Sequence, residues 1–557
     1  MSTSVPSHVT FSIRRDEWLA RTRAWVASWG REAVPFASMA AVALVLRLIG
    51  LDDKAMHHDE AQHAWFGWRL ETGEGYSYDP VFHGPVQFYL IALADFVLGA
   101  GDYVTRLPVA LVGSIAVFLP FFVRRQLGTV AALTASVALA VGPSYLYVSR
   151  FLREDIHVTT VNLAGLVVLI RFLDKPSRWH PIALLSLVAV AFATKETTYI
   201  TVFVLGLFFA ALVVSEAIGL GRGARGVLDT KLVRDIRSLG VAWAWGASAF
   251  LIVYTLLFST FLTSPEGLRE GLVGSIDYWL SQQDVNRGGQ PWFYYLVLIP
   301  AYEWPVVLLG VIGTGVIVRR PTTTGALLVW MFVFSLAIYS WASERMPWLV
   351  VHPLLPLILL AGIGAQKLWD ERSRGWARVA VAATAVLAVG WVYSSVQLVY
   401  FRSADARELL VQVQSSDDVP VIRDELLLLR EVAEQTSGEP PVVQVDSWGG
   451  TGWPWSWYFR DAPVGYYDMS VPDQVDPGAV LLVTDPNHAA MAPKLQGYDA
   501  RRFRLRVWWV PEWGAATPAD WARWALTRRV WSPTATMDEW LYVREDVAEL
   551  ASETPPK

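Results

Sequence analysis

The feature that most limits how this chain can fold is a series of eleven long apolar runs that ends near residue 400. An α-helix needs about 20 mainly apolar residues to cross a bilayer. We place the runs near residues 34–50, 106–122, 128–148, 158–173, 181–194, 198–219, 240–260, 293–318, 322–341, 348–366 and 379–400. Hydrophobic residues make up 54% of the chain and charged residues only 17%. The sequence therefore predicts a polytopic α-helical membrane protein with about 11 spans and additional juxtamembrane helices.

The charges of the loops indicate which side of the membrane each loop faces, because clusters of Lys and Arg stay in the cytoplasm. The basic clusters lie at the N-terminus, at 124–125, at 175–178, at 222–237, at 319–320 and at 367–378. If the shorter apolar stretch 86–100 remains at the surface as a juxtamembrane helix, eleven crossings place all these clusters in the cytoplasm. We therefore predict a multi-pass cell-membrane protein with a cytoplasmic N-terminus and an extracytoplasmic C-terminal part.

The composition divides the chain into three parts. Residues 1–33 are rich in Arg and predict a cytoplasmic amphipathic segment. Residues 34–402 contain the spans and a large first external loop at 51–105, whereas 403–557 have the composition of a soluble domain. Strands are expected there at 441–445, 479–483 and 506–510, and helices at 404–414, 423–435 and 518–529. This alternation predicts a small extracytoplasmic α/β domain.

Composition also excludes some classes of function. The net charge of −5 gives no reason to expect a nucleic-acid partner. The chain has no cysteine, which excludes disulfides and thiol chemistry and, for an exported domain, fits a prokaryotic envelope. It contains no Walker or dinucleotide-binding motif, so a soluble nucleotide-linked substrate finds no support.

The most unusual polar cluster lies in the first external loop, where 57–60 reads His-His-Asp-Glu and His63 follows. Two adjacent carboxylates and three imidazoles beside a span suit acid/base chemistry or metal binding. We predict Asp59 as a general base, with Glu60 as a second catalytic carboxylate, because a carboxylate at a dry membrane face has a raised proton affinity. The alternative is that Asp59 only caps the helix after it. His83, in the turn that closes the same loop, is a candidate substrate contact.

Basic residues in the later external loops are candidates for binding a phosphate group. Arg150 and Arg153 lie in a charged turn between spans, and the forked donors of Arg suit phosphate. Lys195 lies in a four-residue turn, and Arg345 precedes another span. The structural alternatives are a solvated turn for the first pair, a local ion pair for Lys195, and a snorkelling surface arginine for Arg345.

Three other residues are candidates for binding substrate. Glu303 lies between two prolines inside an apolar segment, which predicts a broken helix at a cavity. Glu303 either contacts a sugar there or caps the break. Trp453 and Trp455 belong to the stretch 448–458, which is rich in aromatic residues and glycine. Such rings suit either stacking on sugar faces or docking of the outer domain onto the membrane part.

These motifs together resemble the GT-C superfamily of membrane glycosyltransferases. The resemblance covers roughly 34–400 and rests on the Asp-Glu pair after the first span, on the His-Gly-Pro-Val-Gln-Phe-Tyr turn at 83–89, and on Thr-Arg-Leu-Pro at 105–108. Within the superfamily, the chain is most similar to the branch of dolichyl-phosphate-mannose protein mannosyltransferases and aminoarabinose transferases. The wider string at 57–61, together with 149–155, resembles prokaryotic flippase-activity-associated glycosylation proteins.

The resemblance implies a polyprenyl-phosphate-linked sugar donor, transfer on the external face and a base role for Asp59. In related oligosaccharyltransferases, acidic residues of the second external loop help to hold a divalent metal. The resemblance therefore makes Glu154 and Asp155 candidate metal ligands. The polar cluster itself adds His58, Asp59 and His63 as candidate ligands, although its extra histidines depart from the usual transferase pattern and leave metal use open.

From these features we predict an inverting glycosyltransferase that acts at the lipid bilayer. Its acceptor is a glycan, a lipid or a protein that carries a hydroxyl group. The alternative is a non-enzymatic partner of a flippase, or a transport protein for lipid-linked oligosaccharides. A third hypothesis gives the outer domain a glycan- or protein-binding role, with the membrane part as a platform.

Overall fold

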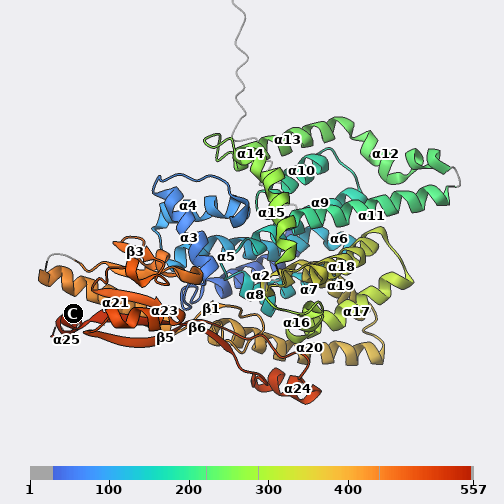
Figure 1. Ribbon diagram of the computed structural model, residues 1–557. Helices are drawn as coiled ribbons and strands as arrows, with labels where there is room; N and C mark the ends of the chain where they lie inside the picture. The colour runs from blue at the N-terminus through green and yellow to red at the C-terminus, as the bar shows by residue number, and fades with distance from the viewer. Residues whose placement is uncertain (1–28, 221–222, 286–287, 438–439, 554–557) are drawn as a thin grey trace, which may run out of the picture.

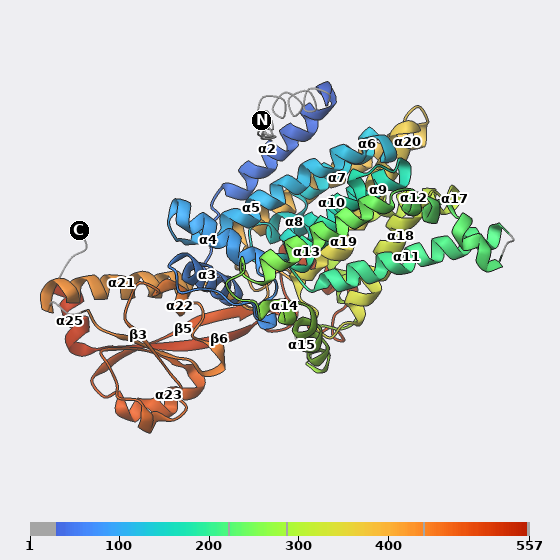
Figure 2. The same ribbon diagram turned by 90° about the horizontal axis from the view of Figure 1, so that it is seen from above.

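The computed structural model describes residues 29–220, 223–285, 288–437 and 440–553. It consists of a bundle of helices with a β-sheet domain at one end, formed by the C-terminal part of the chain (Figures 1 and 2). The described chain enters a short 3-10 helix at Gly30–Ala33. Most of the predicted N-terminal amphipathic segment, residues 1–28, lies outside the described residues.

Seven helices of the described chain are long and apolar enough to cross a membrane. They are α5 through α6 (Asp102–Leu127), α9 (Glu154–Asp174), α11 (Thr197–Gly219), α13 (Gly240–Phe258), α18 (Thr323–Trp341), the turn before α19 with α19 (Pro347–Asp370), and α20 with the turn after it (Gly375–Phe401). Each coincides with a predicted span. The predicted polytopic helical fold is therefore confirmed.

The four other predicted spans are shorter or broken. Helices α2 (Val34–Leu48), α7 (Thr129–Val141) and α10 (Trp179–Phe192) have 15, 13 and 14 residues. The segment predicted at 293–318 consists of α16 (Tyr294–Tyr302) and α17 (Trp304–Arg319), which are bent by 107° at Glu303. This is the broken helix that the flanking prolines predicted. The total number of crossings stays a prediction.

Two short breaks follow from proline chemistry. The predicted run 128–148 divides at Gly142, where α7 ends and α8 (Pro143–Val148) begins. Pro143 has no N–H to continue the first helix, and its fixed φ suits the first position of the next. The stretch predicted as a juxtamembrane helix at 86–100 forms α4 (Val86–Leu98), which packs on α3 (His58–Glu71). Whether α4 crosses the membrane stays a prediction.

The C-terminal part contains a six-stranded mixed sheet with the order β1-β5-β6-β4-β2-β3. The strands are β1 (Gln414–Ser415), β2 (Val443–Asp446), β3 (Val464–Tyr467), β4 (Val480–Thr484), β5 (Tyr498–Trp508) and β6 (Ala535–Arg544). Strand β2 pairs in parallel with β3 and β4, and all other pairs are antiparallel. Helices α21 (Asp418–Ser437), α23 (Asp485–Met491), α24 (Pro518–Thr527) and α25 (Glu545–Glu553) complete the domain. The predicted α/β class is confirmed.

The helix predicted at 404–414 is wrong. The chain is irregular there, and β1 begins at Gln414. Leu409, Leu410 and Val411 are 3%, 2% and 0% exposed. Three consecutive buried side chains do not suit a surface helix, which buries one face and exposes the other. This segment instead packs between the helix bundle and the sheet.

Candidate active site

Asp59 lies in the first turn of α3, and His57 caps this helix. Nδ1 of His57 accepts a hydrogen bond from the backbone N–H of Asp59 at 3.0 Å. The carboxylate of Glu60 accepts one from the backbone N–H of His57 at 3.0 Å. This reciprocal pair is a capping box in which a histidine replaces the usual Ser or Thr. The alternative that Asp59 caps the helix is therefore wrong, and its carboxylate is available for chemistry.

The outer domain holds the segment before Asp59 in place. Nε2 of His57 lies 3.0 Å from the carbonyl oxygen of Gln412, and Ser415 donates to the carbonyl of Met56 at 2.6 Å. The backbone N–H of Met56 donates to the hydroxyl of Tyr458 at 2.8 Å. Because Nδ1 of His57 is an acceptor, its Nε2 carries the proton that Gln412 accepts. Burial lowers the pKa of His57 to about 4, so this histidine is neutral and structural.

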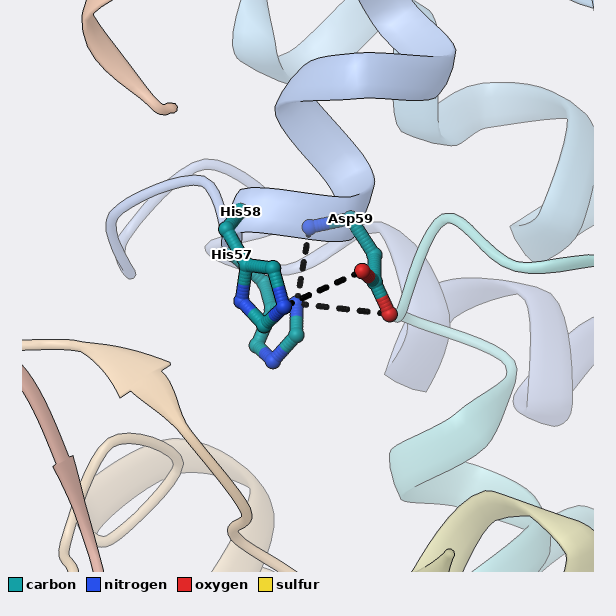
Figure 3. Close-up of side chains that lie close together, drawn as sticks. All are labelled: His57, His58 and Asp59. Carbon is teal, nitrogen blue, oxygen red and sulfur yellow. Dashed lines mark hydrogen bonds and ion pairs between the residues drawn. The ribbon is translucent and has the colours of Figure 1, made fainter. Parts of the chain in front are cut away.

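A cavity of about 290 Å³ opens beside Asp59. It is lined by His58, Asp59, Gln62, His63, Val81, Phe82, His83, Arg153, Tyr278, Trp279, Gln282, Glu344, Met346, Trp348 and Val413. The predicted residues His58, Asp59, His63, His83 and Arg153 therefore meet at one place, although Arg153 belongs to the second external loop and the others to the first. Figure 3 shows the imidazoles of His57 and His58 beside the Asp59 carboxylate; the two ring centroids are 4.0 Å apart.

Two side chains make close contacts with the carboxylate of Asp59, and Nδ1 of His57 lies farther away, 4.0 Å from Oδ2. Arg153 donates to Oδ2 from its guanidinium group, and Nε2 of His58 lies 3.1 Å from Oδ1. Burial raises the pKa of Asp59, but His58 and the cation of Arg153 outweigh it and hold this pKa well below its usual value. The raised proton affinity expected at a dry membrane face is thus wrong. Asp59 is ionised at neutral pH.

Arg153 connects Asp59 to the far wall of the cavity. One of its terminal nitrogens lies 3.3 Å from Nε2 of His83, and its guanidinium carbon is 4.5 Å from the centre of the Trp348 ring. Nδ1 of His83 in turn lies 2.9 Å from the carboxylate of Glu196. His83 has φ of +66°, a left-handed conformation that aims its ring into the cavity. The contacts fix Arg153 between a carboxylate and an aromatic ring.

Glu60 lies behind the cavity wall and not in it. Its two oxygens accept from Arg106 at 2.9 and 2.7 Å, and the backbone N–H of Leu152 donates to it at 2.8 Å. Both ionic side chains are 0% exposed. Burial raises the pKa of Glu60, but Arg106 outweighs it and lowers this pKa to about 2. Glu60 therefore holds α3 to α5 and the second external loop, and it is placed to position Asp59 without touching a substrate.

Asp155 and Lys195 pair with each other. Nζ of Lys195 donates to both oxygens of Asp155 at 2.9 and 2.8 Å, and Nε2 of His352 lies 3.1 Å from Oδ1. Lys195 is 1% exposed and Asp155 0%. The structural alternative for Lys195 was a local ion pair. The observed pair is not local in sequence, because it joins the start of α9 to the turn before α11. Neither residue lines the cavity beside Asp59.

Comparison with known proteins gives the context for this cavity. Residues 82–219 match the family model described as dolichyl-phosphate-mannose-protein mannosyltransferase. The chain is 33% identical over 121 residues to an undecaprenyl phosphate-alpha-4-amino-4-deoxy-L-arabinose arabinosyl transferase of Pseudomonas fluorescens. That match spans 21% of each chain, so it covers only about a fifth of the curated relative.

Solved structures match over nearly the whole length. The structure of ArnT from Cupriavidus metallidurans bound to undecaprenyl phosphate aligns with a TM-score of 0.58 and 17% identity, and covers 94% of this chain and 99% of that one. The oligosaccharyltransferase of Archaeoglobus fulgidus aligns with a TM-score of 0.50 and 13% identity, over 85% of this chain and 69% of that one. The chain has the GT-C fold. The narrower resemblance to flippase-activity-associated glycosylation proteins stays a prediction.

Two predicted phosphate-binding arginines of this chain lie elsewhere and cap helices. Arg150 donates to the carbonyls of Arg47 and Ile49 at 2.7 and 2.6 Å, at the C-terminal end of α2. Arg345 donates to the carbonyls of Ser340 and Gln290 at 3.1 and 2.9 Å. Carbonyl groups at a helix end carry partial negative charge, which explains why guanidinium groups gather there. Arg153 is the predicted phosphate-binding arginine that lines the cavity.

The predicted substrate contacts Glu303, Trp453 and Trp455 also have structural partners. Glu303 accepts from the backbone N–H of Ser144 at 2.9 Å and from Trp391 at 3.1 Å, so it caps the start of α8 and not the break in its own helix. Trp455 is 0% exposed and donates to Glu539 at 2.9 Å. Trp453 packs edge-on against Trp65 of α3, with ring centroids 6.5 Å apart. The geometry favours the docking alternative for the aromatic stretch.

The predicted metal ligands do not all come together. Among the described residues, His57, His58 and Asp59 offer ligand atoms within 4.8 Å of one another. Both ring nitrogens of His57 are already engaged, and the guanidinium of Arg153 occupies one oxygen of Asp59. Oε2 of Glu154 is buried without a hydrogen-bond partner among the described residues, and Oε1 of the same carboxylate lies 3.0 Å from Nε2 of His63, so these two predicted ligands do meet. The contacts around Asp59 form an arginine–carboxylate ion pair more readily than a metal site. Metal binding by these residues stays a prediction.

Several residues that shape the site were not among those predicted. They include His57, which caps α3, and Gln412 of the outer domain, which contacts it. Trp348 and Glu344 belong to a motif in which only Arg345 was selected. Trp348 directly follows Pro347 beside a predicted span, and this aromatic residue near charged groups was a usable signal for a ring beside a cation. Nothing in the sequence indicated that Gln412 would contact a histidine 355 positions away.

Proposed function

We propose that this chain is a membrane glycosyltransferase. It transfers a sugar from a polyprenyl-phosphate-linked donor to a hydroxyl group of an acceptor on the external membrane face. The observation that carries the proposal is the cavity where an ionised Asp59 and the cation of Arg153 meet at the end of the GT-C helix bundle. The GT-C structural neighbour described as bound to undecaprenyl phosphate supports the class of donor.

In the proposed reaction, Asp59 acts as the general base. The acceptor hydroxyl oxygen attacks the anomeric carbon of the sugar, and its proton passes to a carboxylate oxygen of Asp59. The bond between the anomeric carbon and the phosphate oxygen breaks, so polyprenyl phosphate leaves with the bonding electron pair. A single displacement of this kind inverts the anomeric configuration. Because the pKa of Asp59 is low, proton transfer takes place late, when the hydroxyl oxygen already carries positive charge.

Arg153 is proposed to stabilise the departing phosphate. A guanidinium group donates two parallel hydrogen bonds to a phosphate, and charge that develops in a buried site interacts strongly with it. Arg153 is bound to Asp59 and lies over Trp348, so it is held beside the cavity until the donor arrives. As Arg153 turns toward the donor phosphate, Asp59 loses a cationic neighbour and becomes a better base. Nε2 of His83 lies beside the other terminal nitrogen of the Arg153 guanidinium group.

The test is a transfer assay with purified protein, a polyprenyl-phosphate sugar and an added acceptor. Asp59→Asn keeps the shape of the side chain but removes the base, and we expect a loss of about 10²-fold to 10⁴-fold in turnover. Asp52→Asn is the matched control, because Asp52 is exposed in the same loop and does not line the cavity. Unchanged transfer by Asp59→Asn would refute the base role. No transfer by the wild-type protein with any polyprenyl-phosphate sugar would favour a non-enzymatic transport role.

The proposal also requires that the cavity and the sheet domain lie outside the cytoplasm. The two share one end of the bundle, because the sheet domain packs directly on the loop that carries Asp59. A reporter that is active only in the cytosol, fused after Lys557, should be silent. Activity of the reporter at that position would contradict the external location of the site.

A further inference from the structure

A second cavity, of about 470 Å³, lies at the opposite end of the helix bundle from Asp59. It is lined by Trp29, Phe121, Phe122, Arg124, Arg125, Gln126, Arg171, Asp174, Lys175, Pro176, Ser177 and His180. Helix α9 connects the two cavities, because Arg153 precedes its first residue and Arg171 and Asp174 lie in its last turn. Figure 2 shows α6 at the end of the bundle away from the sheet domain.

The length of α9 places this second cavity at the other membrane surface. The helix has 21 residues, which span about 30 Å at about 1.5 Å per residue. This is the thickness of the hydrocarbon core of a bilayer. If one end of α9 lies at the external surface, the other end lies among the lipid head groups of the opposite leaflet. The cavity thus faces phospholipids and not the glycosyl donor site.

The charges around the second cavity are mainly positive. Four cationic side chains and one carboxylate line it. Arg124 pairs with Glu32 at 2.8 Å and lies over the ring of Phe121. Arg125, Arg171 and Lys175 are exposed, and Arg171 also donates to the carbonyl of Phe122 at 3.4 Å. Exposed cations that gather around a concavity at a membrane surface are suited to bind a phosphate group.

Gln126 adds a second recognition element. Its Nε2 donates to Asp174 at 2.8 Å, which fixes the orientation of the amide. Its Oε1 is buried and has no hydrogen-bond partner among the described residues. An unsatisfied buried acceptor is costly, and a hydroxyl group of a ligand would satisfy it. The site therefore offers donors for a phosphate and an acceptor for a hydroxyl group a short distance away.

We propose that this cavity binds the head group of an anionic glycerophospholipid that carries hydroxyl groups, such as phosphatidylglycerol. Arg125, Arg171 and Lys175 bind the phosphate, and Gln126 accepts from a head-group hydroxyl. Trp29 lines the cavity and packs on Phe121 and Phe122, and aromatic residues of this kind are common at membrane interfaces. The lipid holds α6 to the end of α9, on the side of the bundle remote from the sugar chemistry.

The experiment measures lipid retention by the full-length protein in mixed vesicles of phosphatidylglycerol and phosphatidylcholine, with native mass spectrometry and thermal unfolding as readouts. The double variant Arg125→Ala/Lys175→Ala should bind phosphatidylglycerol about 30-fold more weakly, which corresponds to about 1 kcal/mol for each cation at a membrane surface. Gln126→Leu should reduce the preference for phosphatidylglycerol over phosphatidic acid, which has no head-group hydroxyl. A charge-conserving Arg125→Lys/Lys175→Arg variant should retain binding, which separates the effect from misfolding.

The matched control is Arg319→Ala/Arg320→Ala, which removes two exposed cations that lie outside the cavity. Equal lipid binding by the two alanine pairs would overturn the proposal, as would equal retention of phosphatidylglycerol and phosphatidylcholine by the wild-type protein. Full displacement of the lipid by millimolar inorganic phosphate would identify a site for free anions and would also overturn it.

Discussion

Replacement of Arg153 gives the sharpest test of the electrostatics around Asp59. Arg153→Gln removes the cation that donates to the Asp59 carboxylate and leaves a shorter, neutral side chain that still carries N–H donors. An opposite charge at this range lowers the pKa of an Asp by about 1–3 units, and each unit corresponds to about 1.4 kcal/mol. In the variant, burial of Asp59 raises its pKa with less opposition.

The consequence is a shift in the pH dependence of transfer. Asp59 works in its ionised form, so activity falls as the pH falls through its pKa. In the wild-type protein that pKa is far below the usual value, and the acid limb of kcat/KM should lie below about pH 4. In Arg153→Gln the limb should move up by about 1–3 units, and KM for the donor should rise because a phosphate contact is lost.

The assay is the initial rate of sugar transfer from about pH 3 to about pH 8, with kcat and KM determined separately for the donor. Arg153→Lys is the control that keeps the positive charge but not the forked geometry, and its acid limb should move much less than that of Arg153→Gln. An acid limb at the same pH in wild type and Arg153→Gln would refute the assignment of Arg153 as the group that sets the pKa of Asp59. If kcat falls in Arg153→Gln but the acid limb of the pH–rate profile does not move, this arginine has only a general structural role.

Three other predictions concern the supports of the site. Glu60→Gln leaves Arg106 buried without its carboxylate and should lower the free energy of unfolding by about 3–5 kcal/mol in thermal denaturation, whereas Glu74→Gln, in an exposed pair, should change it by less than about 1 kcal/mol. Because the pKa of Glu60 is lowered from 4.5 to about 2, this stability is complete above pH 4.5 and is lost as the pH falls toward 2; a denaturation midpoint that does not change between these pH values would contradict the pairing. Removal of 403–557 should abolish transfer, since Met56 loses its partners in the outer domain, and retained turnover would instead support a detached binding role for that domain. Treatment with a metal chelator should leave the transfer rate unchanged, and restoration of a lost rate by a divalent cation would show that a metal takes part.

Much of the fold could be predicted from the sequence because apolar runs act locally. A bilayer-spanning helix satisfies all its backbone hydrogen bonds within one segment, so its length and composition are enough to predict it. The break at Glu303 followed from the prolines beside it in the same way. The helix expected at 404–414 failed because the burial of 409–411 depends on the sheet and the bundle that enclose them.

Asp59, His58 and Arg153 could be selected from the sequence because they are charged or polar groups next to apolar spans. Their partners could not be, since a sequence with many acidic and basic side chains does not determine which pairs will lie within 4 Å of each other. The tertiary structure decided that Arg106 binds Glu60, that Lys195 binds Asp155, and that Arg153 binds Asp59. It also decided whether the pKa of Asp59 is raised or lowered. Burial raises this pKa and a neighbouring cation lowers it, so the outcome depends on how deeply the carboxylate is buried and how close the cation lies.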